Sequence, residues 1–193
     1  MSDPVPTLAI TAPLRTARLI LRPYEDRDLD FLHSMFGRED VCRYLPWAAM
    51  DLEEARAKLE QRKAQTRIGA DRKAIVLAAV EAGTGHLVGE FMLRLASLEH
   101  LQGEIGWSVH PDFQGRGFGT EGAAEMVRLG FEELGLHRIA AECDPRNLAS
   151  IRVMERLGMR REALLVEAER IKGEWVDSLI HGLLESEWRA AAR

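Results

Sequence analysis

The most informative segment of the chain is Gln114-Gly115-Arg116-Gly117-Phe118-Gly119-Thr120. It follows an alternating, strand-like run over residues 104–109 and opens a helix-like run over residues 121–134. Three glycines at every second position let backbone N–H groups turn inward without Cβ clashes, and the N-terminus of the following helix adds a partial positive charge. Strand, glycine-rich turn and helix therefore predict a cradle for an anion, and the expected ligand carries phosphates.

The same glycines allow a second interpretation, because residues 117–122 also spell the dinucleotide-binding pattern G-x-G-x-x-G. Glu142 lies about 20 residues further on, where the ribose-binding acid of that pattern is expected. In a dinucleotide-binding unit, however, the first glycine follows its strand almost directly, whereas residues 110–116 intervene here and include Pro111. Most of the chain also precedes this unit. These features disfavour a dinucleotide.

Four segments, taken in order, resemble a known family. Residues 114–119 are similar to the Q/R-x-x-G-x-G/A loop that binds the pyrophosphate of acetyl-CoA in the GNAT superfamily of N-acetyltransferases. Residues 147–159 resemble the N-x-x-S…G-F segment of that family. Residues 43–47 (Arg-Tyr-Leu-Pro-Trp) and 172–177 (Lys-Gly-Glu-Trp-Val-Asp) resemble its RimJ/RimL branch, which includes ribosomal-protein N-terminal acetyltransferases. The resemblance covers roughly residues 16–184.

The resemblance implies the GNAT fold, an α/β (α+β) architecture in which a central mixed, mostly antiparallel twisted sheet of about seven strands is flanked by helices. Residue patterns predict strands over 16–22, 74–81, 86–95, 104–109 and 137–143, and a hairpin around 172–173. Helices are predicted over 26–36, 51–65, 121–134 and 147–157. We expect a flexible N-terminal arm over residues 1–12, a single N-acetyltransferase domain over 13–185 and a C-terminal tail over 186–193.

Composition narrows the classes of partner. A formal net charge of −5 gives no overall basic footprint, which disfavours a nucleic acid and fits a cationic acceptor. No stretch approaches 18 consecutive apolar residues and no signal-peptide pattern opens the chain, so we expect no membrane partner and a cytoplasmic location. Cys42 and Cys143 are interpreted as buried thiols, and the histidines show no ligand spacing. No metal is expected.

Acetyl transfer needs a polarised carbonyl, a neutral amine and a site that accepts a thiolate. The resemblance implies that the strand before the cradle splays from its neighbour, and that backbone N–H groups of Trp107, Ser108 and Val109 bind the pantetheine arm of acetyl-CoA. The Val109 N–H is the expected oxyanion donor. The residues expected to hold the pyrophosphate are Gln114, Gly115, Arg116, Gly117, Phe118, Gly119 and Thr120.

Two carboxylates are candidate bases that act through water. Glu104 shares one face of its strand with Ser108, because alternate residues of a strand point to the same side. Glu169 aligns with a glutamate that in RimL-like enzymes is thought to hold a proton-relaying water. The structural alternatives are an ion-paired or strand-end residue for Glu104 and a solvated hairpin residue for Glu169.

The second block supplies candidates for the leaving group. Ser150 aligns with the family serine that can hydrogen-bond the departing thiolate, and Asn147 aligns with the asparagine that holds the pantetheine arm. The alternative is an N-cap asparagine and a first-turn serine that satisfy helix donors. Met154 stands where many GNAT enzymes have a tyrosine acid, and methionine has no proton to donate. Ser150 or solvent would then protonate the thiolate.

The acceptor is the part that the sequence constrains least. Tyr44 and Trp47 are expected to line its site, with a packing role as the alternative. An α-amine with a pKa near 8 is about one-tenth neutral at pH 7, whereas a lysine amine is neutral in less than about one part in a thousand. A protein or peptide N-terminal α-amine is therefore favoured. The alternatives are acetyl transfer, or transfer of a longer acyl group, to a small-molecule amine (polyamine, amino acid derivative or antibiotic), and a CoA-binding sensor without turnover. Relatives of this kind often dimerise, so the resemblance allows a homodimer.

Overall fold

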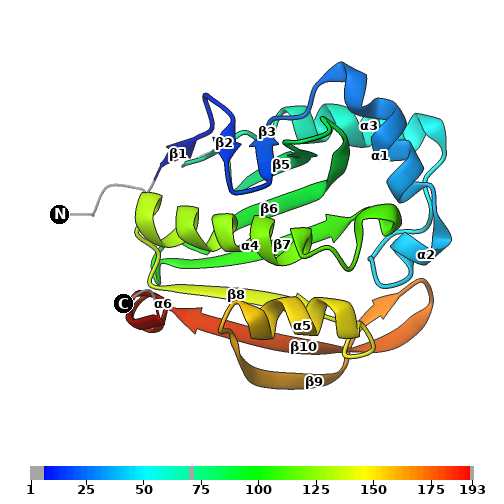
Figure 1. The fold of residues 1–193 in the computed structure, drawn as a ribbon. Helices are drawn as coiled ribbons and strands as arrows, with labels where there is room; N and C mark the ends of the chain where they lie inside the picture. Colours follow the sequence, from blue (N-terminus) through cyan, green and yellow to red (C-terminus); the bar gives the residue numbers. More distant parts are fainter. Residues whose placement is uncertain (1–6, 70–71, 192–193) are drawn as a thin grey trace.

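A twisted sheet organises the protein. The computed structural model describes residues 7–69 and 72–191, and within these ranges eight strands form the sheet in the order β2-β3-β5-β6-β7-β8-β10-β9 (Figure 1). Neighbours run antiparallel except β7 and β8. The strands are β2 (Leu14–Arg15), β3 (Leu19–Arg22), β5 (Ala74–Glu81), β6 (Leu87–Ser97), β7 (Gln102–Val109), β8 (Arg138–Cys143), β9 (Arg160–Ile171) and β10 (Glu174–Leu184). The expected α/β fold with a mixed, mostly antiparallel sheet is confirmed, and β2 is the additional strand.

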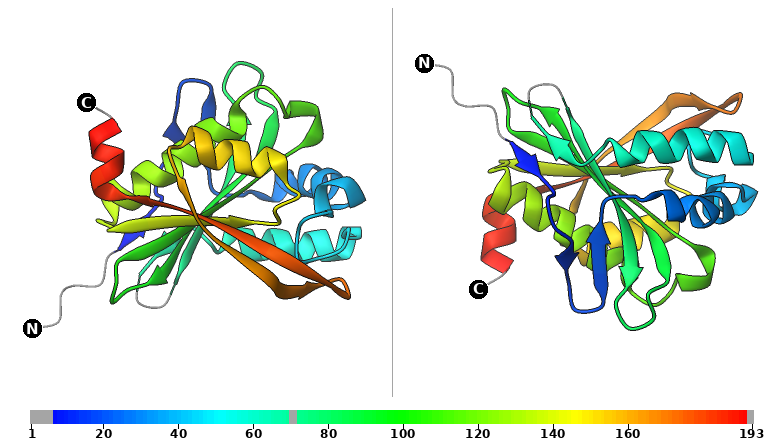
Figure 2. Two further views of the ribbon diagram at one scale, coloured as in Figure 1. Left: turned by 90° about the horizontal axis from the view of Figure 1, so that it is seen from below. Right: turned by 90° about the horizontal axis from the view of Figure 1, so that it is seen from above.

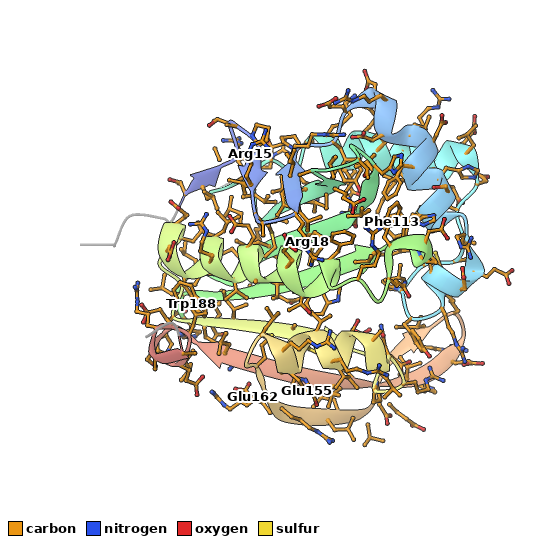
Figure 3. The ribbon with its side chains drawn as sticks, viewed as in Figure 1. Arg15, Arg18, Phe113, Glu155, Glu162 and Trp188 are labelled. Carbon is orange, nitrogen blue, oxygen red and sulfur yellow. The ribbon has the colours of Figure 1, made fainter. Side chains whose placement is uncertain are left out.

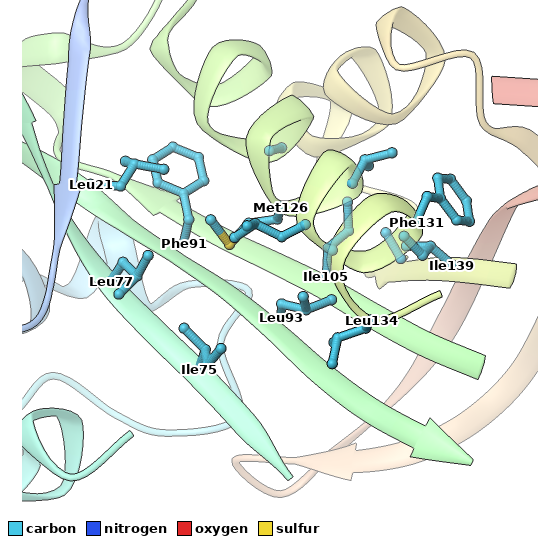
Figure 4. Packing of buried hydrophobic residues seen from close by; sticks show 14 of the residues in the cluster. Leu21, Ile75, Leu77, Phe91, Leu93, Ile105, Met126, Phe131, Leu134 and Ile139 are labelled. Atoms are coloured by element: carbon cyan, nitrogen blue, oxygen red, sulfur yellow. The ribbon is translucent and has the colours of Figure 1, made fainter. Parts of the chain in front are cut away.

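Helices cover both faces of this sheet, as the two views of Figure 2 show. On one face α1 (Leu29–Phe36), α2 (Glu39–Cys42) and α3 (Leu52–Lys63) enclose a small core against β5. On the other face α4 (Phe118–Arg128) and α5 (Leu148–Arg156) cover the larger core (Figure 4). The chain of α4 continues through a π-helical turn over Leu129–Glu133 to Gly135, whose φ of +63° suits the predicted helix end.

Local sequence explains where α3 begins. The Asp51 carboxylate accepts a hydrogen bond from the Glu54 N–H (2.9 Å), and the Glu54 carboxylate accepts one from the Asp51 N–H (3.0 Å). This is the capping box that the sequence predicts at this position. It supplies acceptors for backbone N–H groups at the start of the helix, which have no carbonyl partner within the helix. The first helix differs slightly from its predicted range, because residues 26–28 form a 3-10 turn before α1.

Both ends of the chain differ from the expected loose segments. Within the expected N-terminal arm, β1 (Leu8–Ala9) pairs with β4 (Arg67–Ile68), and Ile10 is buried in the larger core. Residues 1–6 of that arm lie outside the described residues. Within the expected tail, α6 (Glu185–Ala191) places Trp188 against Phe131 with ring centroids 5.5 Å apart. Apolar contacts with the sheet and with α4 therefore order residues that carry no clear periodicity.

The two cysteines are free thiols of different exposure. Cys42 is buried and its Sγ donates to the Phe36 carbonyl at 3.2 Å. Cys143 is only half-buried, at the end of β8, so the expected burial holds for one thiol and is wrong in degree for the other. Burial raises the pKa of Cys143 to about 11, with Asp144 and Glu142 adding to the effect. Among the described residues no helix has the length and apolar character to cross a bilayer.

Helix α4 lies in close contact with β6 in the larger core. A Cβ built on Gly122 would lie 2.2 Å from the Phe91 ring, and Phe91 is fully buried on β6. Glycine therefore sets the distance at which this helix packs on the sheet.

We predict that Gly122→Ala lowers the free energy of unfolding by about 1–3 kcal/mol, because the buried Phe91 ring has no room to move away from the added methyl group. Ala124→Ser, at an exposed position of the same helix, is the control and changes it by about 0.5 kcal/mol or less. Chemical denaturation of both variants measures the difference. Equal stability of Gly122→Ala and the wild type would contradict the packing argument.

Candidate functional site

A fork in the sheet lies beside the glycine-rich stretch. Strands β7 and β8 pair in parallel from Gln102↔Arg138 to Glu104↔Ala140, and the pairing ends there (Figure 1). Strand β7 continues to Val109 along β6, and β8 continues to Cys143 along β10. Each arm of the fork therefore belongs to a different half of the sheet.

Backbone donors of β7 point into this fork. The His110 N–H donates to the Val88 carbonyl at 2.9 Å, and two-residue alternation then pairs the backbone of Ser108 with β6. The same alternation turns the N–H groups of Trp107 and Val109 toward β8, beyond the point where pairing with β8 has ended. Two of the three expected N–H donors thus face the fork, and Ser108 instead places its side chain on the sheet face opposite α4.

The cradle has the backbone that its glycines predict. Gly115 and Gly117 have φ values of +75° and +85°, a region that residues with a Cβ rarely adopt. Gly117 is the N-cap of α4, and the first bond within the helix is from the Glu121 N–H to the Gly117 carbonyl (3.1 Å). The N–H groups of Phe118, Gly119 and Thr120 at the start of α4 therefore have no partner in the helix itself.

Side chains fix the cradle against the rest of the sheet. The Gln114 Nε2 donates to the Val109 carbonyl at 3.0 Å, which ties the loop to the end of β7. The Phe118 ring is buried, so only its backbone faces a ligand. Two guanidinium groups lie over this ring, Arg18 at 4.9 Å and Arg116 at 4.8 Å from the centroid, and Arg116 also pairs with Glu81. Figure 3 shows Arg18 beside the first turn of α4.

The Glu121 carboxylate at the start of α4 links the cradle to residues 16–18. Glu121 accepts hydrogen bonds from the Thr16 hydroxyl (2.5 Å) and from the Arg18 backbone and side chain (2.7 Å each). Burial alone would raise the pKa of Glu121, but the hydrogen bonds from Thr16 and Arg18 lower it below its ordinary value. The sequence offers no signal for this contact, because its members lie about a hundred residues apart.

The residues present fit a phosphate-bearing ligand. The Thr120 hydroxyl oxygen is buried and has no hydrogen-bond partner among the described residues, although buried polar groups are normally paired. It stands in the first turn of α4, next to free N–H groups and the positive end of the helix dipole. A ligand with phosphate oxygens at the cradle would supply the missing acceptors.

The second block lies beside the cradle on α5. The Asn147 side chain caps this helix by accepting from the Ser150 N–H at 3.1 Å, as the structural alternative predicts. A Cβ on Gly119 would lie 3.4 Å from Val153, so the first turn of α4 is in contact with the second turn of α5. Met154 is fully buried in the larger core and is a packing residue. Ser150 remains half-buried near the α5 start.

The two candidate bases are not brought together. Glu104 forms a cross-strand ion pair with Arg94 and is about one-quarter exposed (26%). Glu169 is exposed on β9 opposite Val176. Strands β8 and β10 lie between them, and Glu104 is level with Gly182 of β10 whereas Glu169 is level with Val176, six residues away along that strand. Three strand spacings sideways and six residues lengthwise put roughly 20 Å or more between the two carboxylates. Both have the surroundings that the structural alternatives describe.

Three segments converge beside the open end of the fork. The Lys172 ammonium, at the tip of the β9–β10 hairpin, donates to the carbonyl of Cys42 at the end of α2. Asp144 raises the pKa of Arg146 in the loop after β8, and Glu174 and Tyr44 add to the effect, which places these groups near one another. Tyr44 thus lies at this convergence, where an acceptor site was expected.

Trp47 lies further along the loop between α2 and α3. Its ring contacts Phe36 (5.9 Å between centroids), and the Lys58 ammonium lies 3.9 Å from its centroid. Burial lowers the pKa of Lys58. The indole Nε1 is buried without a hydrogen-bond partner among the described residues. The structure therefore gives Trp47 a packing role and one unsatisfied donor.

One residue near the fork was missed by the sequence reasoning. Glu142 on β8 lies two residues beyond Ala140, the last residue paired with β7, and accepts a hydrogen bond from the Ser178 hydroxyl. In the sequence Glu142 stands out only as the acid of the dinucleotide pattern, which has no part in acetyl transfer. Strand alternation alone places it on the face of Ala140 and Glu104.

Comparison with known proteins gives this geometry a family. The profile of the acetyltransferase (GNAT) domain matches residues 18–160, which include the fork, the cradle and α5. The chain belongs to the GNAT family of acetyltransferases. Among GNAT relatives, the uncharacterised N-acetyltransferase YnaD of Bacillus subtilis (strain 168) is 33% identical over 175 residues, with 91% of this chain and 98% of YnaD covered.

Solved GNAT structures have the same fold. The crystal structure of a GNAT-family acetyltransferase from Bacillus anthracis is 31% identical, covers 91% of this chain and 100% of its own, and superposes with a TM-score of 0.82. Spermidine N-acetyltransferase from Vibrio cholerae, in complex with CoA and spermine, is 22% identical with a TM-score of 0.75, and 90% of this chain and 99% of that chain are covered. The protein is an acetyl-CoA-dependent N-acetyltransferase.

We predict that Gly117→Glu abolishes acetyl-CoA binding in calorimetry while the protein stays folded, because it places a carboxylate where phosphates should lie. Gly117→Ala is the matched control, since it carries the same backbone strain at φ +85° without the charge. Binding by Gly117→Ala should be weakened far less. If Gly117→Glu binds as the alanine variant does, the phosphate assignment of the cradle is wrong.

Proposed function

We propose that this GNAT enzyme acetylates the N-terminal α-amine of a protein or peptide, by direct attack in a ternary complex and in the manner of the RimJ/RimL branch. The proposal rests on the finding that neither candidate base, Glu104 or Glu169, is free and placed at the fork. Glu104 is engaged by Arg94, and Glu169 lies exposed on an outer strand. An α-amine is already about one-tenth neutral at pH 7, so it needs less help from a general base than a lysine amine does.

The donor site supports this reaction through backbone groups. Acetyl-CoA, when bound, supplies the thioester carbonyl. The N–H groups of Trp107 and Val109 that face the fork are the proposed donors to the pantetheine arm and to the carbonyl oxygen, where negative charge develops. The cradle N–H groups and the Thr120 hydroxyl are the proposed partners of the pyrophosphate. Asn147, already fixed as a helix cap, is the proposed contact for the arm.

The chemical step then proceeds by direct attack, without a covalent intermediate on the enzyme. The neutral amine nitrogen forms a bond to the thioester carbon, and the carbon–sulfur bond breaks with its electron pair on sulfur. The amine loses a proton to water, and the thiolate takes one up. Ser150 is the proposed hydrogen-bond donor to the thiolate, because Met154 is buried and has no proton to give.

A small polyamine or other small-molecule amine is the second candidate acceptor. The spermidine N-acetyltransferase whose structure contains CoA and spermine has the same fold over 90% of this chain. The Lys172 contact with the Cys42 carbonyl also closes one side of the convergence of α2 and the hairpin, which favours a compact acceptor. Tyr44 is proposed to line this site in both cases, and Trp47 to support it.

We predict that Ser150→Ala keeps acetyl-CoA affinity within about threefold and lowers kcat by about tenfold or more, as expected when one hydrogen bond to a developing charge is lost. Calorimetry with acetyl-CoA and a thiol-release assay separate the two effects. Because the Asn147 cap accepts from the backbone N–H of Ser150 and not from its hydroxyl, the α5 cap is retained in the variant. Unchanged turnover would remove Ser150 from the mechanism.

An acceptor panel tests the proposed substrate class. Purified protein with saturating acetyl-CoA is assayed for thiol release against peptides with free and blocked N-termini, polyamines and amino acid derivatives. Turnover on peptides that disappears when the N-terminus is blocked is the expected result. Turnover confined to small amines would move the assignment to the second candidate.

A further inference from the structure

Three carboxylates lie on the sheet face that α4 does not cover, one on each of the strands around the fork. Alternation places Glu90 on β6 and Glu104 on β7 on this face, because their α4-side neighbours Phe91 and Ile105 are buried in the larger core. The pair Glu104↔Ala140 carries the same face across to β8, where Glu142 follows two residues later. These three residues share one surface and differ in their partners.

Glu90 is neutralised by a buried network. The Arg62 guanidinium contacts both of its carboxylate oxygens, at 2.6 and 3.1 Å, and the Tyr24 hydroxyl donates to it at 3.0 Å. Burial raises the pKa of Tyr24, which keeps the phenol as a neutral donor. All three side chains are nearly fully buried. Burying a charged carboxylate is costly unless a cation pairs with it, and the bidentate contact with Arg62 supplies that pairing for Glu90.

Glu104 is also matched by an arginine, since Arg94 stands directly opposite on β6 and pairs with it. Glu142 differs from both. Its one polar partner among the described residues is the neutral Ser178 hydroxyl, and Ser178 itself is buried on β10. Glu142 is exposed and no cation of the described chain pairs with it. The fork thus carries one oriented, unneutralised carboxylate on the acceptor side.

Glu142, the carboxylate without a cationic partner in the described chain, lies close to the proposed position of the thioester. Continuing the parallel register past Glu104↔Ala140 sets Glu142 across the fork from Gly106, one residue before Trp107. The proposed thioester carbonyl lies against the N–H groups of Trp107 and Val109. An amine that reaches this carbonyl from the face opposite α4 must pass beside Glu142.

We propose that Glu142 binds the ammonium form of the acceptor as it enters, before the amine gives up a proton to water and attacks, and thereby sets the preference of the enzyme for cationic amines, with Ser178 holding the carboxylate in place. The inference rests on the proposed acetyl transfer. Glu90 and Glu104 each have an arginine as a charged hydrogen-bond donor, whereas Glu142 has none among the described residues. An ammonium group of the acceptor would supply this charge-assisted hydrogen bond to Glu142. Glu142 is a specificity-determining residue common to both candidate acceptors, since α-ammonium groups and polyamines are both cations.

The test compares Glu142→Gln, Glu142→Asp and Ser178→Ala with the wild type, using an N-terminally free peptide, spermidine and an arylamine that is uncharged at the assay pH. Glu142→Gln should raise KM for the cationic acceptor at least about tenfold, the effect of losing one charge-assisted bond. KM for acetyl-CoA and for the arylamine should stay within about twofold. Glu142→Asp should recover most of the loss, and Ser178→Ala should lie between. Glu99→Gln, an exposed carboxylate in the turn before β7, is the matched control.

Calorimetric titration of cationic amine into the CoA-bound protein gives a second reading that does not need turnover. Weaker binding by Glu142→Gln than by Glu99→Gln supports the inference. Equal binding, an unchanged acceptor KM, or an equal rise in KM for acetyl-CoA would each overturn it, and so would failure of every cation to bind the wild type. Binding of cations that depends on Glu142 without wild-type turnover would instead overturn the proposed function alone.

Discussion

The end of pairing between β7 and β8 is the constraint on which the site depends. Both strands stay fully paired on their outer sides, β7 with β6 and β8 with β10, so neither is free to close the gap. The packing of α4 and α5 at Gly119 and Val153 holds the two halves of the sheet at this spacing on the covered face. The N–H groups of Trp107 and Val109 are left facing the fork because of this geometry. Unpaired donors inside a folded sheet are costly unless a ligand or water satisfies them.

Electrostatics around the fork follows a simple division. The donor side holds N–H dipoles, a helix N-terminus and arginines that are already matched by Glu81 and Glu121. Anion binding there depends on oriented backbone groups more than on free charge. The acceptor side holds carboxylates of which two are matched by arginines. The protein thus keeps opposite local polarities on the two faces of one opening.

Sequence reasoning recovered what local rules determine. The glycines at 115 and 117, the capping box at Asp51 and the strand over 74–81 each follow from turn, cap or periodicity rules, and all are present. The family resemblance supplied the fork, which no local pattern encodes. Side-chain pairings are not encoded in local patterns: the Arg18–Glu121 ion pair joins residues 103 apart, and the Arg94 partner of Glu104, ten residues away, depends on the register of two strands. Strand alternation alone places Glu142 on the face of Glu104, but its hydrogen bond with Ser178, 36 residues away on another strand, cannot be read from the sequence.

The narrow seam between the half-sheets also has a consequence for cooperativity. Only three residue pairs join β7 to β8, compared with eight between β6 and β7 and six between β8 and β10 among the described strands. The larger core nevertheless runs through both halves, with Ile105 of β7 and Ile139 of β8 in one cluster, so beyond the three pairs the halves are joined by side-chain packing and not by backbone pairing. A ligand that contacts both β7 and β8 adds links between the two halves where backbone pairing is absent, and its binding energy therefore stabilises the folded domain as a whole.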